Sequence, residues 1–194
     1  MSISQKLPQL SQSLEGELLY DDLHKILYAT DASAYRIPPI AVAIPKSVGD
    51  IVKIIRFAAD NKISITPRTA GTSLAGQTVG SGIIVDVSKH FTKIVSFDQI
   101  NKTITVQPGV IRDELNLYLK PYGLFFGPNT STSNRCMVGG MVGNNSSGTT
   151  SIRYGVTRDK IVEIKAILSD GSAVVFKEMS SEEFIEKTKG NTLE

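Results

Sequence analysis

One glycine-rich stretch decides the fold, Pro67-Arg68-Thr69-Ala70-Gly71-Thr72-Ser73-Leu74-Ala75-Gly76-Gln77. It directly follows residues 63–66, whose β-branched side chains predict a strand. Glycine lets a backbone turn tightly and approach a ligand with no Cβ in the way. Successive N–H groups in such a turn form a concave anion site, and nearby threonine and serine hydroxyls add donors. The stretch therefore suits a pyrophosphate, although many glycine loops serve only as turns.

Two familiar phosphate motifs fit this stretch poorly. A P-loop requires lysine where Gln77 stands, and it opens into a helix, whereas Gly80-Ser81-Gly82 and a predicted strand follow here. The dinucleotide pattern G-x-G-x-x-G is absent from the stretch, and no parallel strand–helix–strand unit follows it. Both an NTPase and a Rossmann domain are therefore disfavoured.

A second stretch rich in small residues spans residues 127–148, GPNTSTSNRCMVGGMVGNNSSG. Its small side chains would let the backbone lie against a flat ligand, while asparagine and serine donate or accept hydrogen bonds. The alternative is a flexible polar linker. Apolar Met137, Val138, Met141 and Val142 alternate with the glycines, which a solvated linker does not need. An irregular segment as long as residues 127–158 is usually functional or disordered.

The segments around these stretches predict an α+β fold. Helical spacing of leucines predicts a helix over residues 14–28, and a second helix runs from Val48 to Asn61 after a capping box at Ser47 and Asp50. Strands at 40–44 and 63–66 flank it and indicate a parallel pairing. Further strands are expected at 83–87, 93–97, 103–107, 161–168 and 173–176, with a helix at 110–119. We expect a small α/β lobe with parallel strands (about 14–90) and a larger, mainly antiparallel lobe with helices (about 91–180).

Composition narrows the class of protein. The chain has 194 residues, a formal net charge of +2, one cysteine and two histidines. A disulfide framework and a zinc or iron–sulfur site built from its own cysteines are excluded. Neither a basic arm nor a long apolar run is present, so we expect no nucleic-acid partner and no transmembrane segment. A reduced, cytoplasmic setting fits. We interpret residues 193–194, Leu-Glu, as the scar of an expression tag and exclude them.

At these residues the sequence resembles the FAD-binding domain shared by vanillyl-alcohol oxidase and p-cresol methylhydroxylase. Residues 67–77 look like its pyrophosphate loop, residues 106–110 like its strand-to-helix junction, and residues 127–148 with Arg153-Tyr154-Gly155 like its second flavin segment. The likeness extends back through residues 28–33 and 44–47 and covers nearly the whole of residues 1–192. It is most specific for the branch of glycolate oxidase subunits and D-lactate dehydrogenases, including long members with iron–sulfur motifs.

The resemblance implies noncovalent FAD held between the two lobes. Since the first stretch contains no histidine, a covalent flavin link there is disfavoured. The residues that the resemblance assigns to the cofactor are Pro67, Arg68, Thr69, Ala70, Gly71, Thr72, Ser73, Leu74, Gln77, Pro108, Gly109, Pro128, Ser133, Val138, Gly139, Gly140, Asn144, Asn145, Gly148, Tyr154, Gly155 and Ile161.

Single residues with charge or reactivity leave alternatives open. Arg68 either pairs with a phosphate or merely flanks its loop. Arg135 and Arg153 are candidates for a substrate carboxylate. Asp31 is expected to cap a turn, and Cys136 to be a buried structural thiol rather than a nucleophile.

The resemblance implies a 2-hydroxy-acid dehydrogenase or oxidase acting on a small molecule such as D-lactate or glycolate. The alternatives are a flavin- or nucleotide-binding module without turnover and a UDP-sugar reductase-type flavoprotein. The catalytic base and the electron acceptor are unknown, and an iron–sulfur cluster is expected only in C-terminal regions absent from this chain. A link to the electron acceptor would place the protein at the periphery of a membrane.

Overall fold

The computed structural model describes residues 2–190 and 192–193. Its N-terminal half is built on a mixed four-stranded sheet, whose strands lie in the order β1-β2-β4-β3. These are β1 (Glu17–Leu19), β2 (Ala41–Ile44), β3 (Ile65–Arg68) and β4 (Ile83–Asp86). Strand β4 lies between β2 and β3 and runs parallel to both, while β1 is an antiparallel edge. The expected parallel arrangement is therefore confirmed, but β2 and β3 are not neighbours.

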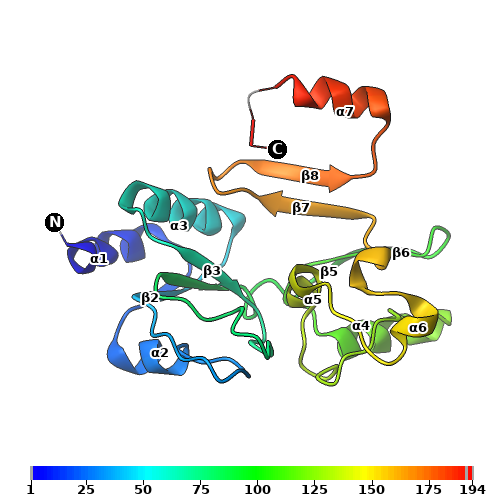
Figure 1. Cartoon of the computed structure of the whole chain (residues 1–194), viewed down its shortest axis with the longest axis horizontal. Coiled ribbons are helices and arrows are strands. Elements are labelled where there is room, and N and C mark those ends of the chain that lie inside the picture. The colour runs from blue at the N-terminus through cyan, green and yellow to red at the C-terminus, as the bar shows by residue number, and fades with distance from the viewer. Residues whose placement is uncertain (1, 191, 194) are drawn as a thin grey trace.

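Helices cover both faces of this sheet, which explains why β2 and β4 are buried throughout. Successive side chains of a strand point to opposite faces. Ala41 and Ala43 accordingly pack with residues of α1 (Ile3–Ser13) and α3 (Val48–Asn61). Val42 and Ile44 lie in a separate cluster with Leu19 and Tyr28, on the face where α2 (Asp22–Leu27) is found (Figure 1).

The prediction of one helix over residues 14–28 is wrong. Residues 17–19 form β1, and a short helix, α2, starts after Asp21, whose carboxylate accepts from the His24 N–H at 3.1 Å. The cause is tertiary: the Glu15 and Gly16 N–H groups both donate to the buried Asp50 carboxylate at 2.9 Å, and β1 pairs with β2. The preceding helix α1 contains Pro8, a residue that disfavours helix interiors, so its sequence signal is weak.

Asp50 also modifies the capping box expected at the start of α3. The Ser47 hydroxyl accepts from the Asp50 N–H at 3.3 Å, as expected of an N-cap. The Asp50 carboxylate, however, accepts from the Lys46 N–H at 3.0 Å and from the Glu15 and Gly16 N–H groups, rather than from Ser47. Only half of the box is formed, because the carboxylate anchors the preceding turn instead.

The C-terminal half contains two antiparallel strand pairs and several short helices. The first pair is β5 (Ile94–Asp98) with β6 (Thr103–Val106), and the second is β7 (Glu163–Ile167) with β8 (Ala173–Lys177). The expected hairpin is therefore present, but the antiparallel strands form two separate ladders. The helices are α4 (Arg112–Leu119), η1 (Lys120–Tyr122), α5 (Val138–Asn144), α6 (Ser151–Tyr154), η2 (Thr157–Lys160) and α7 (Ser181–Thr188).

A second core holds this half together. Val110, Leu115, Leu119 and Val138 are buried, and side chains of β5 and β6 pack against them. The hairpin β7–β8 runs from this group back over α3, where its turn residue Gly171 lies against Val52 (Figure 1). Residues 127–158 contain α5, α6 and the first half of η2, so the segment is ordered by short helices rather than structureless. Of residues 193–194, interpreted as a tag scar, Glu194 lies outside the described residues.

Candidate functional site

The first glycine-rich loop, residues 69–78, leaves the carboxyl end of β3, an end of the sheet where ligands commonly bind in α/β folds. Gly71 and Gly76 have φ of 66° and 70°, a left-handed conformation that favours glycine. Within residues 2–190 and 192–193, no protein acceptor faces the N–H groups of residues 70–74. This run of free donors is what an anion site needs.

Ser73 within the first loop and Arg68 just before it make different kinds of contact. The Ser73 hydroxyl donates to Gln77 Oε1 at 2.8 Å and accepts from the Ala75 N–H at 3.2 Å, so it closes the loop on itself. The Arg68 guanidinium donates to the Thr30 carbonyl at 2.8 Å and lies 5.1 Å from the centre of the Tyr28 ring. The structure therefore places the Arg68 guanidinium against the segment between β1 and β2.

The second glycine-rich segment meets the first loop where α5 begins. The Val138 and Gly139 N–H groups donate to the Val110 and Pro108 carbonyls at 2.9 and 2.8 Å. A side chain at Gly139 would overlap Pro108, and a Cβ at Gly140 would lie 2.7 Å from the Thr69 hydroxyl oxygen. Three segments that the sequence singled out, residues 67–77, 108–109 and 138–140, therefore lie together.

The rest of the second segment is fixed by its own contacts. The Pro128 carbonyl accepts from Arg112 Nε at 3.1 Å, and the Ser133 hydroxyl donates to Asp113 at 2.9 Å. Gly148 packs so tightly against the Asn129 carbonyl that no side chain fits. These hydroxyl and carbonyl groups of the segment are thus bonded to, or packed against, other groups of the protein.

The end of the segment is held in the same way. Asn144 is exposed and donates to the Ser146 hydroxyl at 3.0 Å, while Asn145 accepts from the Arg158 N–H at 3.0 Å. Tyr154 packs edge-on against Phe125, with 5.0 Å between ring centres. Gly155, with a φ of 76°, ends α6.

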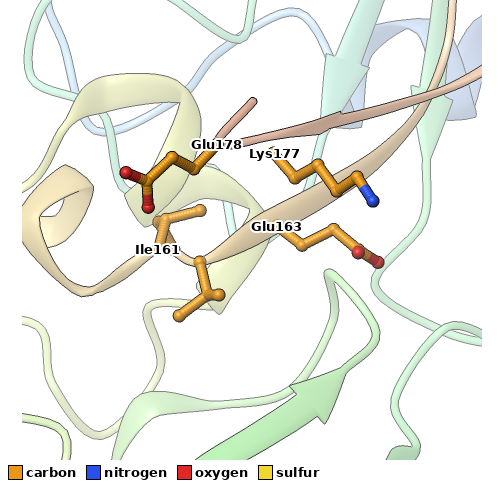
Figure 2. A pocket seen from close by; sticks show the side chains of 5 residues that line it. Ile161, Glu163, Lys177 and Glu178 are labelled. Atoms are coloured by element: carbon orange, nitrogen blue, oxygen red, sulfur yellow. The ribbon is translucent and has the colours of Figure 1, made fainter. Parts of the chain in front are cut away.

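Ile161, which was expected to pack on the cofactor, lies just before β7 and is half-buried. It lines a hollow of about 410 Å³ together with Val162, Glu163, Lys177 and Glu178. Figure 2 shows the Glu163 and Lys177 side chains extending the same way from neighbouring strands, with Ile161 and Glu178 at the other end. The hollow is therefore lined by three charged side chains, Glu163, Lys177 and Glu178, and by apolar Ile161 and Val162.

Two aspartates anchor the two loops. Burial alone would raise the pKa of Asp31, but hydrogen bonds from Ser33 and Thr78 hold that pKa below its ordinary value. The hydrogen bond from the Arg112 guanidinium, at 2.8 Å, is the main reason why the pKa of Asp113 is lowered, and Ser133 adds to it. Both carboxylates are therefore charged acceptors at neutral pH.

A half-buried tyrosine, Tyr28, was not among the sequence candidates. The Tyr28 hydroxyl donates to Asp86 at 2.6 Å, and burial together with this bond raises the pKa of the phenol. Fifty-eight residues separate the two, so no local pattern could have revealed the pair. Cys136 is buried, 3.1 Å from the Thr130 hydroxyl and 3.6 Å from the Met141 sulfur, in keeping with a structural thiol.

Among the described residues, no cluster of three or more His, Cys, Asp or Glu side chains is arranged to hold a metal ion. No described helix is long and apolar enough to cross a membrane. Arg135 and Arg153 are both exposed, and Arg153 lies 5.5 Å from the centre of the Tyr154 ring. Neither arginine is brought to the first loop by a contact.

A family model described as an FAD binding domain matches residues 39–177. A D-2-hydroxyglutarate dehydrogenase of Haemophilus influenzae is 39% identical over 178 residues, which is 90% of this chain and 17% of that protein. The glycolate oxidase subunit GlcD of Bacillus subtilis is 32% identical and shares 89% of this chain and 37% of its own length. The chain thus spans about a sixth of the dehydrogenase.

Solved structures share the fold. The BBE-like 1 protein of Physcomitrella patens superposes with a TM-score of 0.79 at 20% identity, over 92% of this chain and 39% of that one. An alkyldihydroxyacetonephosphate synthase superposes with a TM-score of 0.78 at 18% identity, over 93% of this chain and 36% of the synthase. These neighbours confirm the expected α+β architecture and, at such low identity, nothing beyond the fold.

Proposed function

This chain belongs to the FAD binding domain family, and from that premise we propose that it is the flavin-binding part of an oxidoreductase that oxidises a D-2-hydroxy acid. The relatives include a D-2-hydroxyglutarate dehydrogenase, a glycolate oxidase subunit and a D-lactate dehydrogenase. Residues 1–192 would form one FAD-binding unit, with lobes at about 14–90 and 91–180. The small-molecule substrate would be bound by the full-length protein.

One observation carries the proposal: free backbone donors of the first loop lie where two other glycine segments converge. The N–H groups of residues 70–74 suit the two phosphates of FAD. A Cβ at Gly140 would lie only 2.7 Å from the Thr69 hydroxyl oxygen, so glycine lets the second segment lie against the start of the first loop. Two segments held this close, beside a run of free donors, fit an extended dinucleotide.

The residues proposed to hold FAD follow from this arrangement. The first loop would bind the pyrophosphate through residues 70–74, helped by Thr69 and Thr72. Pro128, Gly139, Gly140, Asn144 and Gly148 would line the path of the nucleotide, and Ile161 would lie against it from the hollow beside β7. The bound flavin supplies an acceptor for the hydride of the 2-hydroxy acid. The proposal assigns the proton-accepting base to no residue of this chain.

Two variants of one helix test the proposed site. Gly140→Val places a side chain against the Thr69 hydroxyl and pushes the two segments apart, whereas Gly143→Val places the same side chain on α5 where nothing lies within 4 Å. Titration of each purified protein, followed by quenching of FAD fluorescence, should give wild-type affinity for Gly143→Val. Gly140→Val should bind at least about tenfold more weakly, a loss of roughly 1.4 kcal/mol.

The outcomes test separately whether the chain binds FAD, whether the two loops form the site, and whether the protein oxidises a 2-hydroxy acid. If the wild-type chain binds no FAD, the proposed function is wrong. If both variants bind FAD equally well, the two-loop site is wrong. Flavin-loaded full-length protein is then mixed anaerobically with D-2-hydroxyglutarate, D-lactate or glycolate. Bleaching of the flavin supports the oxidoreductase, and unchanged absorbance with all three acids favours a binding module without turnover.

A further inference from the structure

A short segment between β1 and β2 contacts the first glycine loop. We call residues 28–37 the brace. It is closed on itself by the Ile37 N–H, which donates to the Ala29 carbonyl at 2.8 Å, and by an antiparallel bridge between Thr30 and Arg36. Ala29 is fully buried, and Tyr28 ties the start of the brace to the end of β4 through Asp86. The brace is thus a compact element attached to the carboxyl edge of the sheet.

The brace contacts the middle and the far end of the loop. In the middle, the Ala32 N–H donates to the Gly71 carbonyl at 3.2 Å. At the far end, Asp31 accepts from the Thr78 hydroxyl at 3.2 Å and from its N–H at 3.4 Å. These bonds occupy a carbonyl and the trailing end of the loop but leave the donors of residues 70–74 free.

Arg68 joins the brace to both ends of the loop. Its Nη1 donates to the Thr30 carbonyl at 2.8 Å and to the Thr78 carbonyl at 3.4 Å, and its guanidinium lies over the Tyr28 ring. The same guanidinium lies under Gly71, because a Cβ added there would be 2.5 Å from Nη2. Arg68 therefore fills the inside of the loop's curve, with carbonyl oxygens as its partners.

We infer that Arg68 is a positioning residue, which with the brace holds the first loop in its anion-binding shape rather than meeting the anion through its charge. This inference rests on the proposed FAD function. A planar guanidinium that stacks on a ring while donating to several carbonyls has no equivalent in lysine, which keeps only the charge. The two roles therefore predict opposite results for Arg68→Lys.

The experiment measures FAD affinity of Arg68→Lys at about 0.02 M and about 0.5 M salt, which span weak and strong screening. A positioning role predicts about tenfold weaker binding at both salts, as expected if the competent loop is populated about a tenth of the time. Arg56→Lys is the matched control, because Arg56 lies on α3 beside Gly171, away from the loop. Its affinity should equal that of the wild type.

A second pair of variants tests the brace without touching Arg68. Thr78→Val removes the hydroxyl that Asp31 accepts from, and Thr78→Ser restores it. We expect Thr78→Val to weaken FAD binding several-fold and Thr78→Ser to recover it, when each affinity is measured well below the melting temperature of the flavin-free protein. A role confined to global stability would move the melting temperature instead.

Each result decides the inference. Wild-type affinity in Arg68→Lys, or a loss that disappears at high salt, overturns it, because either result assigns the effect to charge. Equal affinities of Thr78→Val and Thr78→Ser overturn the role of the brace. Failure of the wild-type chain to bind FAD is a different result, which removes the proposed function itself.

Discussion

The two glycine-rich loops use glycine for different physical reasons. In the first loop, Gly71 and Gly76 have positive φ, so the backbone conformation itself demands glycine. In the second segment, Gly139 and Gly148 have ordinary φ but lie against Pro108 and the Asn129 carbonyl, so space demands it. The first loop is shaped by its dihedral angles and the second by close packing.

This difference extends to how the backbone donors are used. In the second segment the Val138 and Gly139 N–H groups donate to the Val110 and Pro108 carbonyls, whereas the N–H groups of residues 70–74 have no such partner among the described residues. A loop with free donors must be held from outside, and the brace does so through Arg68 and Asp31. The comparison teaches that the packed segment forms the wall of the proposed site and the braced loop its anion contact.

The largest expected effect concerns packing in the second segment. Gly148→Ala places a Cβ on the Asn129 carbonyl, so the backbone must move, and we expect the free energy of unfolding to fall by about 3 kcal/mol. Urea denaturation measures it. Gly143→Ala is the control on the same segment: its Cβ meets nothing, and alanine favours the helix by up to about 1 kcal/mol. Equal stabilities of the two variants would contradict the packing account.

The conformational account of the first loop predicts a smaller loss of stability with a larger loss of binding. Gly71→Ala forces a side chain into the left-handed region, which costs about 1–2 kcal/mol of unfolding free energy. Its Cβ also displaces the Arg68 guanidinium, so FAD affinity should fall. Gly123→Ala has the same positive φ with nothing nearby, and it should lose similar stability while keeping its FAD affinity. Parallel affinity losses would refute a specific role for Gly71.

The smallest expected effect is a pH dependence that separates the anchors of the two loops. Hydrogen bonds lower the pKa values of Asp31 and Asp113 in the folded protein. The stability that each carboxylate contributes is therefore complete above its ordinary pKa of about 3.9, and it is lost as the pH falls below that value toward the lowered pKa. FAD affinity should accordingly decline in acid.

Two variants test whether the fall of FAD affinity in acid comes from the anchor of the first loop. Asp31→Asn should bind FAD more weakly at neutral pH and show a flatter response to acid, because its contact with Thr78 no longer titrates. Asp98→Asn is the control, since Asp98 has a lowered pKa but lies at the end of β5, bonded to Asn101. If Asp98→Asn flattens the response equally, the anchor assignment fails. The measurement is FAD affinity between about pH 3 and pH 7, the range that includes the ordinary carboxyl pKa.

Much of the fold followed from local patterns. The helix from Val48 to Asn61 and the hairpin around Gly171 match their expected positions, because their periodicity and turn residues agree with the tertiary structure. The helix expected at 14–28 failed where long-range bonds to Asp50 overrode leucine spacing. The placement of β4 between β2 and β3 could not be predicted from the sequence either, because strand order depends on pairing between distant segments.

The sequence by itself determined the class of fold, the glycine segments and the family resemblance, because these depend on residue type and on spacing within a few residues. Only the tertiary structure decided what those segments touch. It brought Gly140 to Thr69, turned Arg68 toward Thr30, and joined Asp31 to Thr78, 47 residues away. Such contacts form between surfaces that exist only after folding. The residues around one side chain in the sequence therefore do not indicate which distant residue it will contact.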